Sequence, residues 1–362
     1  MARIDLVGIA HSYRPNPAKP SDYALRPTID LTWDDAGAYA LLGPSGSGKS
    51  TLLNILSGLV VPSHGKLMFD GVDVTRLPTR ARNIAQVFQF PVIYDTMSVF
   101  DNLAFPLRNR GVDTATVNTR VGQVAEILEL TGDLKKRASG LTADAKQRIS
   151  MGRGLVRKDV SAILFDEPLT VIDPHLKWVL RRKLKQIHHE LAITLIYVTH
   201  DQTEALTFAD KVVVMDDGIV LQQGSPQNLF EEPAHAFVGH FIGSPGMNLV
   251  PCVRDDGAVA VDGQRLAFAP ALLARAGSRT LTLGIRPEFV SLDDPGDAMR
   301  LDVVVDETEQ LGGHQLVTAI VGGKRFMIKA APGMPVTAGQ ARAAWLPRGR
   351  AKLYADNVLV TP

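Results

Sequence analysis

A glycine-rich segment at residues 43–50, the phosphate loop, has the residue types that hold a phosphate group. It matches the pattern G-x-x-x-x-G-K-[ST], in which glycines let backbone N–H groups converge on phosphate oxygens without obstruction by side chains. A helix after such a loop directs the positive end of its dipole at the same anion. In this pattern Lys49 reaches the β- and γ-phosphates, and the hydroxyl of Ser50 ligates Mg²⁺. The candidate phosphate-binding residues are Gly43, Ser45, Gly46, Ser47, Gly48, Lys49, Ser50 and Thr51.

A second chemical feature is a pair of adjacent carboxylates, Asp166 and Glu167, directly after the apolar run at residues 162–165. An acid at the end of such a strand holds the Mg²⁺ shell, which is the role expected for Asp166. Glu167 could orient and deprotonate a water molecule that attacks the γ-phosphate. Taken alone, the pair would be two solvated acids at a strand end. Together with the phosphate loop, it predicts a site for nucleotide hydrolysis.

Short apolar runs alternate with helical stretches through the first two thirds of the chain. Residues 38–42, 161–165 and 193–198 are nearly continuous apolar runs, as expected for parallel strands that are covered on both faces of the sheet. Helices are expected at residues 50–59 and 174–191. This alternation predicts an α/β fold, in which the phosphate loop follows the first of these strands.

The last third of the chain, after the cluster at residues 243–246, has a different pattern. Short β-like runs are separated by Gly, Pro and Asp, which indicates a small β-rich domain or barrel. These runs are residues 281–285, 301–305, 315–320 and 325–328. We therefore expect one domain at residues 1–240 and a second at residues 244–362.

The composition excludes several classes of protein. A length of 362 residues suggests two or three domains. Lys and Arg number 39 and Asp and Glu 38, for a net charge of +1, which argues against a nucleic-acid partner. The one cysteine, Cys252, excludes an internal disulfide framework and fits a reducing compartment. Neither a secretory leader nor an apolar run of about 18–20 residues is visible, so the expectation is a cytosolic protein.

Three further segments complete a characteristic order of motifs. Gln89 follows the phosphate loop by about 40 residues, residues 141–148 precede the two acids by about 20 residues, and residues 197–201 follow those acids. This order resembles that of an ATP-binding-cassette (ABC) ATPase. The segments that resemble ATPases of the maltose- and glycerophosphate-type importers are residues 165–169, 198–205 and 283–288.

The resemblance implies a fold and two cofactors. The fold would be an α/β P-loop NTPase, an ABC cassette with a RecA-like core and a helical subdomain at about residues 90–160. A small all-β, OB-like regulatory domain would follow it. The implied cofactors are ATP and Mg²⁺, and the implied metal-binding residues are Ser50, Gln89 and Asp166, the last acting through water.

The resemblance also assigns roles to single residues. Gln89 would touch Mg²⁺ and the attacking water, and His200 would contact the γ-phosphate, so that both join Glu167 in the catalytic set. Asp173 would belong to the loop that crosses the interface between two cassettes. Asp173 is also a good cap for the helix that Pro174 begins, and both readings can hold.

Aromatic residues are implied at two further places. Tyr13 resembles the residue that stacks on adenine, but a Pro-rich insertion lengthens its distance from the phosphate loop and leaves Tyr23 as an alternative. The segment from Phe90 to Pro106 would receive the membrane subunits. Its aromatic residues could equally be core of the helical subdomain; they are Phe90, Tyr94, Phe100 and Phe105.

The signature loop departs from the family pattern. The family reads Leu-Ser-Gly-Gly-Gln where this chain has Leu141, Thr142, Ala143, Asp144 and Ala145. In the family this loop contacts the γ-phosphate bound by the other subunit. Asp144 adds a carboxylate there, and two unit charges 4 Å apart repel by about 4 kcal/mol at an effective dielectric of 20. Thr142 and Asp144 are also good residues for starting a helix, which does not restore phosphate binding.

This departure predicts the assembly. A homodimer would have a defective signature at both ATP sites, so we expect a heterodimer in which a second ATPase supplies an intact signature. The alternative is a non-hydrolysing regulatory subunit, against which the intact Glu167 argues. A DNA-maintenance ATPase would carry long coiled coils between Gln89 and Leu141, which are only about 50 residues apart, and a translation-factor ATPase would carry two cassettes.

The expected function is ATP hydrolysis for solute import. The signature and the overall sequence of the chain resemble one of the two ATPases of a bacterial glycerol importer. Glycerol-3-phosphate and oligosaccharide importers are the alternatives. The implied partners are the second ATPase, two permease subunits and an extracytoplasmic solute-binding protein. The implied location is the cytoplasmic face of the bacterial inner membrane.

Overall fold

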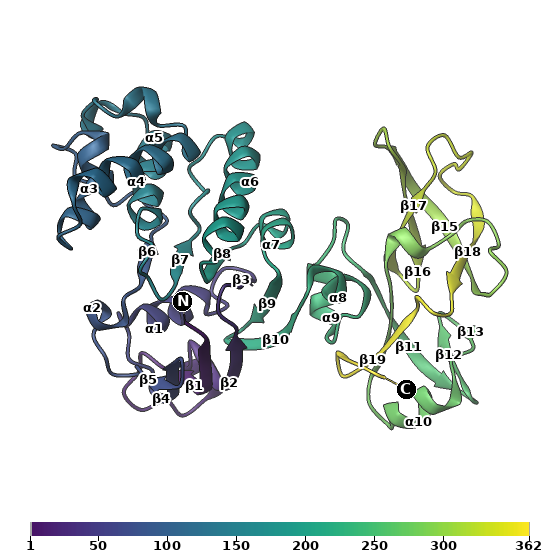
Figure 1. The fold of residues 1–362 in the computed structure, drawn as a ribbon. Coiled ribbons are helices and arrows are strands. Elements are labelled where there is room, and N and C mark those ends of the chain that lie inside the picture. The colour runs from purple at the N-terminus through teal and green to yellow at the C-terminus, as the bar shows by residue number, and fades with distance from the viewer. Residues whose placement is uncertain (1, 362) are drawn as a thin grey trace. The chain divides into compact units, whose positions relative to one another are not determined.

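The strand before the phosphate loop, β3 (Ala38–Leu42), lies inside a six-stranded sheet of order β10-β9-β3-β8-β7-β6 (Figure 1). In this computed structural model, which describes residues 2–361, β9, β3, β8, β7 and β6 are parallel and β10 is antiparallel to β9. Every residue of β3 and β8 is buried, which confirms the α/β expectation. The other strands are β6 (Ala85–Val87), β7 (Ile163–Asp166), β8 (Leu195–Thr199), β9 (Lys211–Asp216) and β10 (Ile219–Gly224).

A second, antiparallel sheet of order β2-β1-β4-β5 was not predicted from the sequence. Its alternating buried residues join those of the first sheet and of α1 (Lys49–Ser57) in one core. The four leucine and isoleucine side chains of α1 in this core are Leu52, Leu53, Ile55 and Leu56. The helix after the phosphate loop is therefore held by both sheets. The strands are β1 (Ile4–His11), β2 (Leu25–Trp33), β4 (His64–Phe69) and β5 (Val72–Asp73).

Three helices between β6 and β7 form the group at the upper left of Figure 1, where the sequence predicts a helical subdomain. Each begins at a polar residue whose side chain accepts a hydrogen bond from a first-turn N–H, and these caps are Ser98, Asp113 and Thr142. The segments that follow β7 and β8 end in the same way, with Asp173 and Asp201 as caps of the next helices. The helices are α2 (Thr79–Arg82), α3 (Val99–Arg108), α4 (Thr114–Ile127), α5 (Ala143–Leu155), α6 (Pro174–Leu191) and α7 (Gln202–Phe208).

The C-terminal part contains two antiparallel sheets, of orders β13-β12-β11-β14-β19-β20 and β17-β16-β15-β18, around a core of its own. The predicted β-like runs lie in β14, β15, β16 and β17, which confirms the β-rich expectation. The strands are β11 (Asn248–Asp255), β12 (Ala258–Val261), β13 (Gln264–Leu266), β14 (Leu281–Ile285), β15 (Ala298–Gln310), β16 (Gln315–Val321), β17 (Lys324–Ala330), β18 (Ala341–Pro347), β19 (Lys352–Ala355) and β20 (Val358–Leu359). The helices are α8 (Pro226–Glu231), α9 (Ala236–Phe241) and α10 (Pro270–Ala276).

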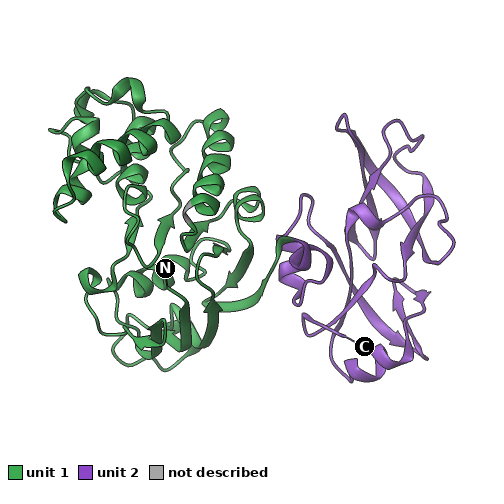
Figure 2. Ribbon diagram, in the orientation of Figure 1, with its two compact units in different colours: residues 1–226 green, residues 227–362 purple. Residues whose placement is uncertain are grey.

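The chain divides into units of residues 1–226 and 227–362, earlier than the expected change at residues 240–244 (Figure 2). Arg286, which is fully buried, accounts for the difference. Its guanidinium donates to the carbonyl oxygens of Phe230 (2.6 Å) and Ile242 (2.5 Å) and lies 3.9 Å from the centre of the Phe230 ring. The segment that carries α8 and α9 is thereby bound to the β-rich unit. Residues 1 and 362, the outer limits of the expected domains, lie outside the described residues.

Within residues 2–361, none of the helices combines the length and the apolar character needed to cross a membrane.

Candidate nucleotide-binding site

The phosphate loop connects β3 to α1 and uses its glycines where side chains would collide. A Cβ on Gly43 would lie 2.1 Å from the carbonyl oxygen of Met215, and one on Gly48 would lie 2.6 Å from that of Ala24. Gly46 and Gly48 have φ angles of 82° and 97°, in the left-handed region that favours glycine. Ser45 and Gly46 are exposed at the tip, whereas Ser47 is buried. The loop therefore has the open backbone cradle that the sequence predicts.

Lys49, the first residue of α1, folds over this cradle. Its ammonium group donates to the carbonyl oxygens of Gly43 (2.9 Å) and Pro44 (2.8 Å) and lies 3.3 Å from Oγ of Ser47. Lys49 is 6% exposed, and its burial lowers the pKa of the ammonium group, while Glu167 and Asp166 oppose that shift. Because these acceptors are neutral carbonyl and hydroxyl oxygens, the positive charge of the nearly buried Lys49 is available to an incoming phosphate group.

Asp166 is the last residue of β7, and its surroundings suit a divalent cation that is held together with other oxygen ligands. Burial raises the pKa of the Asp166 carboxyl, the charge of Glu167 raises it further, and a hydrogen bond from Ser50 and the charge of Lys49 lower it. A hydroxyl and a carboxylate are oxygen ligands of the kind that Mg²⁺ prefers when phosphates and water complete its shell. Among residues 2–361, His, Cys, Asp and Glu form no cluster of three that could hold a metal without such help.

Glu167 is the meeting point of the predicted catalytic residues. Oε1 of Glu167 lies 3.1 Å from Nδ1 of His200, and Oε2 accepts a hydrogen bond from Nε2 of Gln89 at 3.2 Å. Gln89, Glu167 and His200 follow β6, β7 and β8, whose carboxyl ends meet at one edge of the parallel sheet. The Thr170 hydroxyl, which the sequence did not indicate, donates to Oε2 from 3.4 Å.

A second group that the sequence analysis missed surrounds His200. The Thr199 hydroxyl donates to Oε2 of Glu204 (2.8 Å) and accepts from the N–H of Asp201 (3.0 Å). The Asp201 carboxylate accepts from the N–H of Glu204 (3.2 Å), which closes a ring across the His200 backbone. Tyr197 also donates to Glu204, which is 4% exposed. Thr199 and Glu204 lie within the motif at residues 198–205, but that pattern does not reveal the ring.

Gln147 connects three parts of the site and was also missed. It is fully buried in α5, the helix that begins at the signature loop. Its Nε2 donates to the carbonyl oxygens of Phe88 and Pro168, both at 3.0 Å. Because Phe88 precedes Gln89 and Pro168 follows Glu167, Gln147 connects α5 to the backbone next to both of these residues.

The signature residues lead into the first turn of α5, and one expectation about them needs correction. Oδ2 of Asp144 lies 2.8 Å from Nη2 of Arg148, an i,i+4 ion pair in which both side chains are mostly buried. The repulsion expected between Asp144 and a phosphate assumed an uncompensated carboxylate, whereas Arg148 neutralises it. Leu141 precedes the cap Thr142, whose hydroxyl accepts from the N–H of Ala145 at 3.3 Å. What remains of the departure is steric, because Cβ atoms at residues 143 and 144 stand where the family has glycine.

The two candidate adenine-binding residues differ in position. Tyr13, which follows β1, is 64% exposed, and its Oη lies 3.3 Å from Oγ1 of Thr51 in α1. The edge of its ring contacts His11, with the ring centres 4.6 Å apart. Tyr23 is partly buried. Tyr13 is therefore an exposed aromatic residue in contact with the helix that follows the phosphate loop, as a stacking residue requires.

The other predicted residues are separate from this centre. Asp173 accepts from the N–H of His175 (2.9 Å) at the start of α6, as expected for a cap. Phe90 and Tyr94 are 71% and 40% exposed, and Phe100 and Phe105 are half-buried; Tyr94 and Phe105 pack together with ring centres 4.7 Å apart. The segment from Phe90 to Pro106 is thus part surface and part subdomain core.

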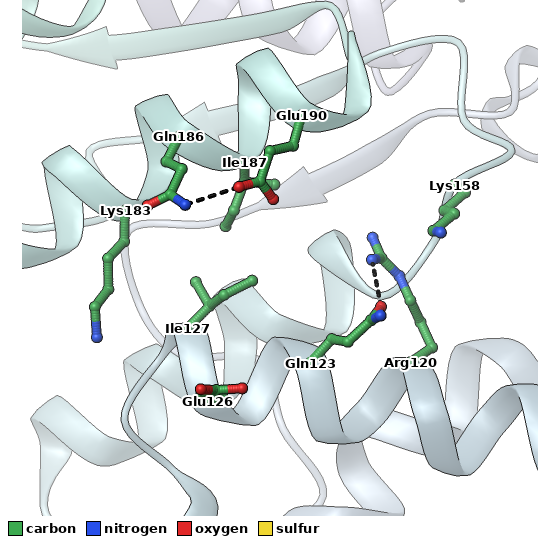
Figure 3. A pocket seen from close by; sticks show the side chains of 9 residues that line it. All are labelled: Arg120, Gln123, Glu126, Ile127, Lys158, Lys183, Gln186, Ile187 and Glu190. Atoms are coloured by element: carbon green, nitrogen blue, oxygen red, sulfur yellow. Dashed lines mark hydrogen bonds between the residues drawn. The ribbon is translucent and has the colours of Figure 1, made fainter.

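A polar cavity of about 560 Å³ lies between α4 and α6, away from the predicted site (Figure 3). The two hydrogen bonds drawn in Figure 3 each join residues of the same helix: Gln186 donates to Glu190 on α6, and Arg120 donates to Gln123 on α4. Charges of both signs line it. The cavity contains neither the phosphate loop nor the two acids, so it is not the nucleotide site.

Three known protein families together match most of the chain. Residues 27–170 match the family described as ABC transporter, residues 243–290 the MalK OB fold domain, and residues 283–352 the TOBE domain. The first of these matches contains the phosphate loop, Gln89, the signature residues and both acids.

Several known proteins are similar to the chain. The sn-glycerol-3-phosphate import ATP-binding protein UgpC of Vibrio vulnificus is 38% identical over 321 residues, 88% of this chain and 86% of that protein. UgpC of Paraburkholderia xenovorans is 41% identical over 328 residues, 88% of this chain and 90% of its own. Among solved structures, cbiO1 of Clostridium perfringens, part of the ABC transporter complex cbiONQ, has a TM-score of 0.57 and 26% identity, and covers 63% of this chain and 90% of its own.

A second solved structure supports the fold alone. It is the ATP-binding cassette MJ0796, in a dimeric post-hydrolysis state bound to ADP and Pi, with a TM-score of 0.54 and 24% identity. It covers 62% of this chain and 98% of its own.

Proposed function

Because this chain belongs to the ATP-binding subunits of ABC importers, in which ATP hydrolysis is coupled to import, we propose that it powers the uptake of a small polyol or sugar-type solute. Glycerol is the specific solute that we propose, with glycerol-3-phosphate or an oligosaccharide as alternatives. The relatives named above are sn-glycerol-3-phosphate import ATP-binding proteins, which supports the class of solute. The observation that carries the catalytic proposal is the convergence of Gln89 and His200 on Glu167, beside the phosphate loop.

Each residue of the site has a distinct part in this proposal. When bound, Mg²⁺ and ATP supply a polarised γ-phosphate as the electrophile. Lys49 exchanges its carbonyl contacts for phosphate oxygens, and the loop N–H groups hold the same group. Glu167 accepts the proton of the attacking water at a carboxylate oxygen. Gln89 and His200, which contact its two oxygens, orient that carboxylate.

The solute can be assigned by uptake measurements in a strain that lacks this chain. We expect the deletion to abolish uptake of labelled glycerol at low external concentration and to leave uptake of sn-glycerol 3-phosphate and of a labelled oligosaccharide unchanged, because an ATPase powers only the importer whose membrane subunits it binds. Re-expression of the chain restores uptake, and re-expression of Lys49→Ala does not. Loss of sn-glycerol 3-phosphate or oligosaccharide uptake alone would support the corresponding alternative, and unchanged uptake of all three solutes would contradict the proposed class of solute.

Tyr13 is proposed as the residue that stacks on adenine. Its exposed ring beside Thr51 supports this choice over Tyr23. We expect Tyr13→Ala to weaken ATP binding about tenfold, since stacking of a base on an aromatic ring contributes about 1–3 kcal/mol. Tyr23→Ala is the matched control and should change the affinity less than twofold. Equilibrium titration with a fluorescent ATP analogue measures both, and the reverse order would assign the role to Tyr23.

The proposed assembly is a heterodimer of this chain with a second ATPase. It is supported by the Cβ atoms of Ala143 and Asp144, which narrow the approach of a phosphate to the start of α5. Two permease subunits would dock on the segment from Phe90 to Pro106, where Phe90 and Val92 are 71% and 53% exposed. An extracytoplasmic solute-binding protein completes the proposed importer, and this chain would lie at the cytoplasmic face of the bacterial inner membrane.

A further inference from the structure

The Pro-rich insertion that follows Tyr13 lies in the connection from β1 to β2. A segment of this kind has few ways to order its own backbone, because each proline lacks the N–H group that would hold a turn. Its three prolines are Pro15, Pro17 and Pro20. Tyr13, the residue that we propose for adenine, therefore stands at the start of a segment that depends on side-chain contacts for its order.

The carboxylate of Asp22 makes these contacts, and its side chain is only 10% exposed. Oδ2 accepts hydrogen bonds from the N–H groups of Ala18 (2.9 Å) and Lys19 (3.0 Å), and Oδ1 lies 2.5 Å from Nη1 of Arg14. The hydrogen bonds from Ala18 and Lys19 lower the pKa of the Asp22 carboxyl, burial opposes that shift, and the charge of Arg14 adds to it. Asp22 is therefore an ionised residue that binds both ends of the insertion.

The backbone on both sides of Tyr13 is also connected to Asp22. The Ser12 hydroxyl donates to the carbonyl oxygen of Asp22 at 2.7 Å and accepts from the N–H of Arg14 at 3.0 Å. The N–H of Ser12 donates to Oγ of Ser63 at 3.2 Å. The residue before Tyr13 and the residue after it are thus both held, which restricts the backbone of Tyr13 itself.

Two further contacts hold the side chain of Tyr13. The ring of His11, which is 7% exposed, stands at 90° to the Tyr13 ring with the centres 4.6 Å apart. On the other side, Oη of Tyr13 lies 3.3 Å from Oγ1 of Thr51. Tyr13 nevertheless remains 64% exposed. A ring that is both held and accessible before the ligand arrives loses less conformational freedom when the ligand binds.

We propose that Asp22 is a positioning residue of the nucleotide site, which orders the Pro-rich insertion so that the Tyr13 ring is held where adenine stacks. The inference rests on the role that we propose for Tyr13. Asp22 acts through Tyr13 and not on the nucleotide directly, so its effect concerns the base and spares the phosphates. Without Asp22, the insertion would have to become ordered as ATP binds, and the cost of that ordering would appear as a weaker affinity.

The test compares two ligands of the purified full-length chain in the presence of Mg²⁺: ATP, and inorganic tripolyphosphate, which has no base. Competition against a fluorescent ATP analogue measures both affinities. We expect Asp22→Ala to weaken ATP binding about fivefold, the scale of one or two hydrogen bonds, and to change the affinity for tripolyphosphate less than twofold. Asp22→Asn keeps an oxygen acceptor but loses the charge that attracts Arg14, so its ATP affinity should lie between those of the wild type and Asp22→Ala.

Asp73→Ala is the matched control. Asp73 lies in β5 of the same antiparallel sheet, and its carboxylate accepts hydrogen bonds from the N–H (2.9 Å) and the hydroxyl (2.6 Å) of Thr75. Its replacement should change the affinity for ATP less than twofold. In a Tyr13→Ala chain, Asp22→Ala should weaken ATP binding no further, because the stacking on which Asp22 acts is already lost. Thermal unfolding of every variant checks that it is folded.

Two results would overturn this inference and leave the role of Tyr13 intact. One is a normal ATP affinity in Asp22→Ala beside a weakened one in Tyr13→Ala. The other is an equal loss of affinity for ATP and for tripolyphosphate in Asp22→Ala, which would show that Asp22 supports the whole site and not the base alone. An unchanged ATP affinity in Tyr13→Ala would instead overturn the proposed role of Tyr13, and the inference with it.

Discussion

We expect Glu167→Gln to lower ATP turnover at this chain's site by about 10²- to 10⁴-fold, the usual contribution of a positioned general base. Glutamine keeps the size of the side chain and can still contact Gln89 and His200, but its amide cannot take the proton of the attacking water. ATP binding should persist, because Lys49 and the loop N–H groups are untouched. Single-turnover hydrolysis and nucleotide titration on the assembled transporter measure the two effects separately.

Glu190→Gln is the matched control for this substitution. Glu190 lies on α6 and accepts from Gln186 at 2.7 Å, away from the phosphate loop (Figure 3). Its replacement should leave turnover unchanged. Turnover of Glu167→Gln within tenfold of the wild type would contradict the assignment of Glu167 as the base. If the transporter keeps full activity with this one chain altered, the chain is a regulatory ATP-binding subunit.

The second large effect concerns the signature loop. We expect the chain purified alone to hydrolyse ATP slowly and a restored signature to raise its turnover about 100-fold, the scale of a single transition-state donor. The restored signature combines Thr142→Ser, Ala143→Gly, Asp144→Gly and Ala145→Gln. The physical reason is that removing two Cβ atoms lets the start of α5 approach the phosphate bound by a second copy. Arg148 would keep its hydrogen bonds to the carbonyl oxygens of Leu128 and Glu129, so the helix stays anchored.

The same restored signature in a Glu167→Gln background is the control, and it should give no increase. Native mass spectrometry of the intact transporter gives the second measurement, with one copy of this chain beside one different ATPase expected. Two copies of this chain in a transporter of normal activity, or a wild-type chain that alone matches the restored variant, would contradict the heterodimer.

Local sequence was sufficient for the features that depend on neighbouring residues. The phosphate loop, the helix after it and the acids at the end of β7 follow from residue types within short windows, because glycine conformations, caps and strand ends are local properties. The Asp144–Arg148 pair is equally local, since residues four apart share one face of a helix. Its spacing could have revealed that the carboxylate is neutralised.

Features that join distant segments were predicted only where a family pattern stood behind them. The antiparallel sheet of β1, β2, β4 and β5 was missed; its central pair, β1 with β4, joins strands on either side of a segment that contains the phosphate loop and α1. The ring of Thr199, Asp201 and Glu204 is local in the sequence and was nevertheless missed, because a polar residue at a strand end has many possible partners. The choice of Tyr13 over Tyr23 stays a prediction, because spacing along a Pro-rich insertion does not give a position in space; the contact of Tyr13 with Thr51 supports it.

By itself, the sequence determined the fold class, the phosphate loop and the identity of the two acids, since each depends on residues close together along the chain. Only the tertiary structure decided that Gln89 and His200 meet at Glu167, and that Gln147 connects α5 to the backbone next to both Gln89 and Glu167. The reason is geometric. These contacts depend on the order of strands in the sheet and on the packing of helices against it, neither of which is set by the spacing of residues in the chain.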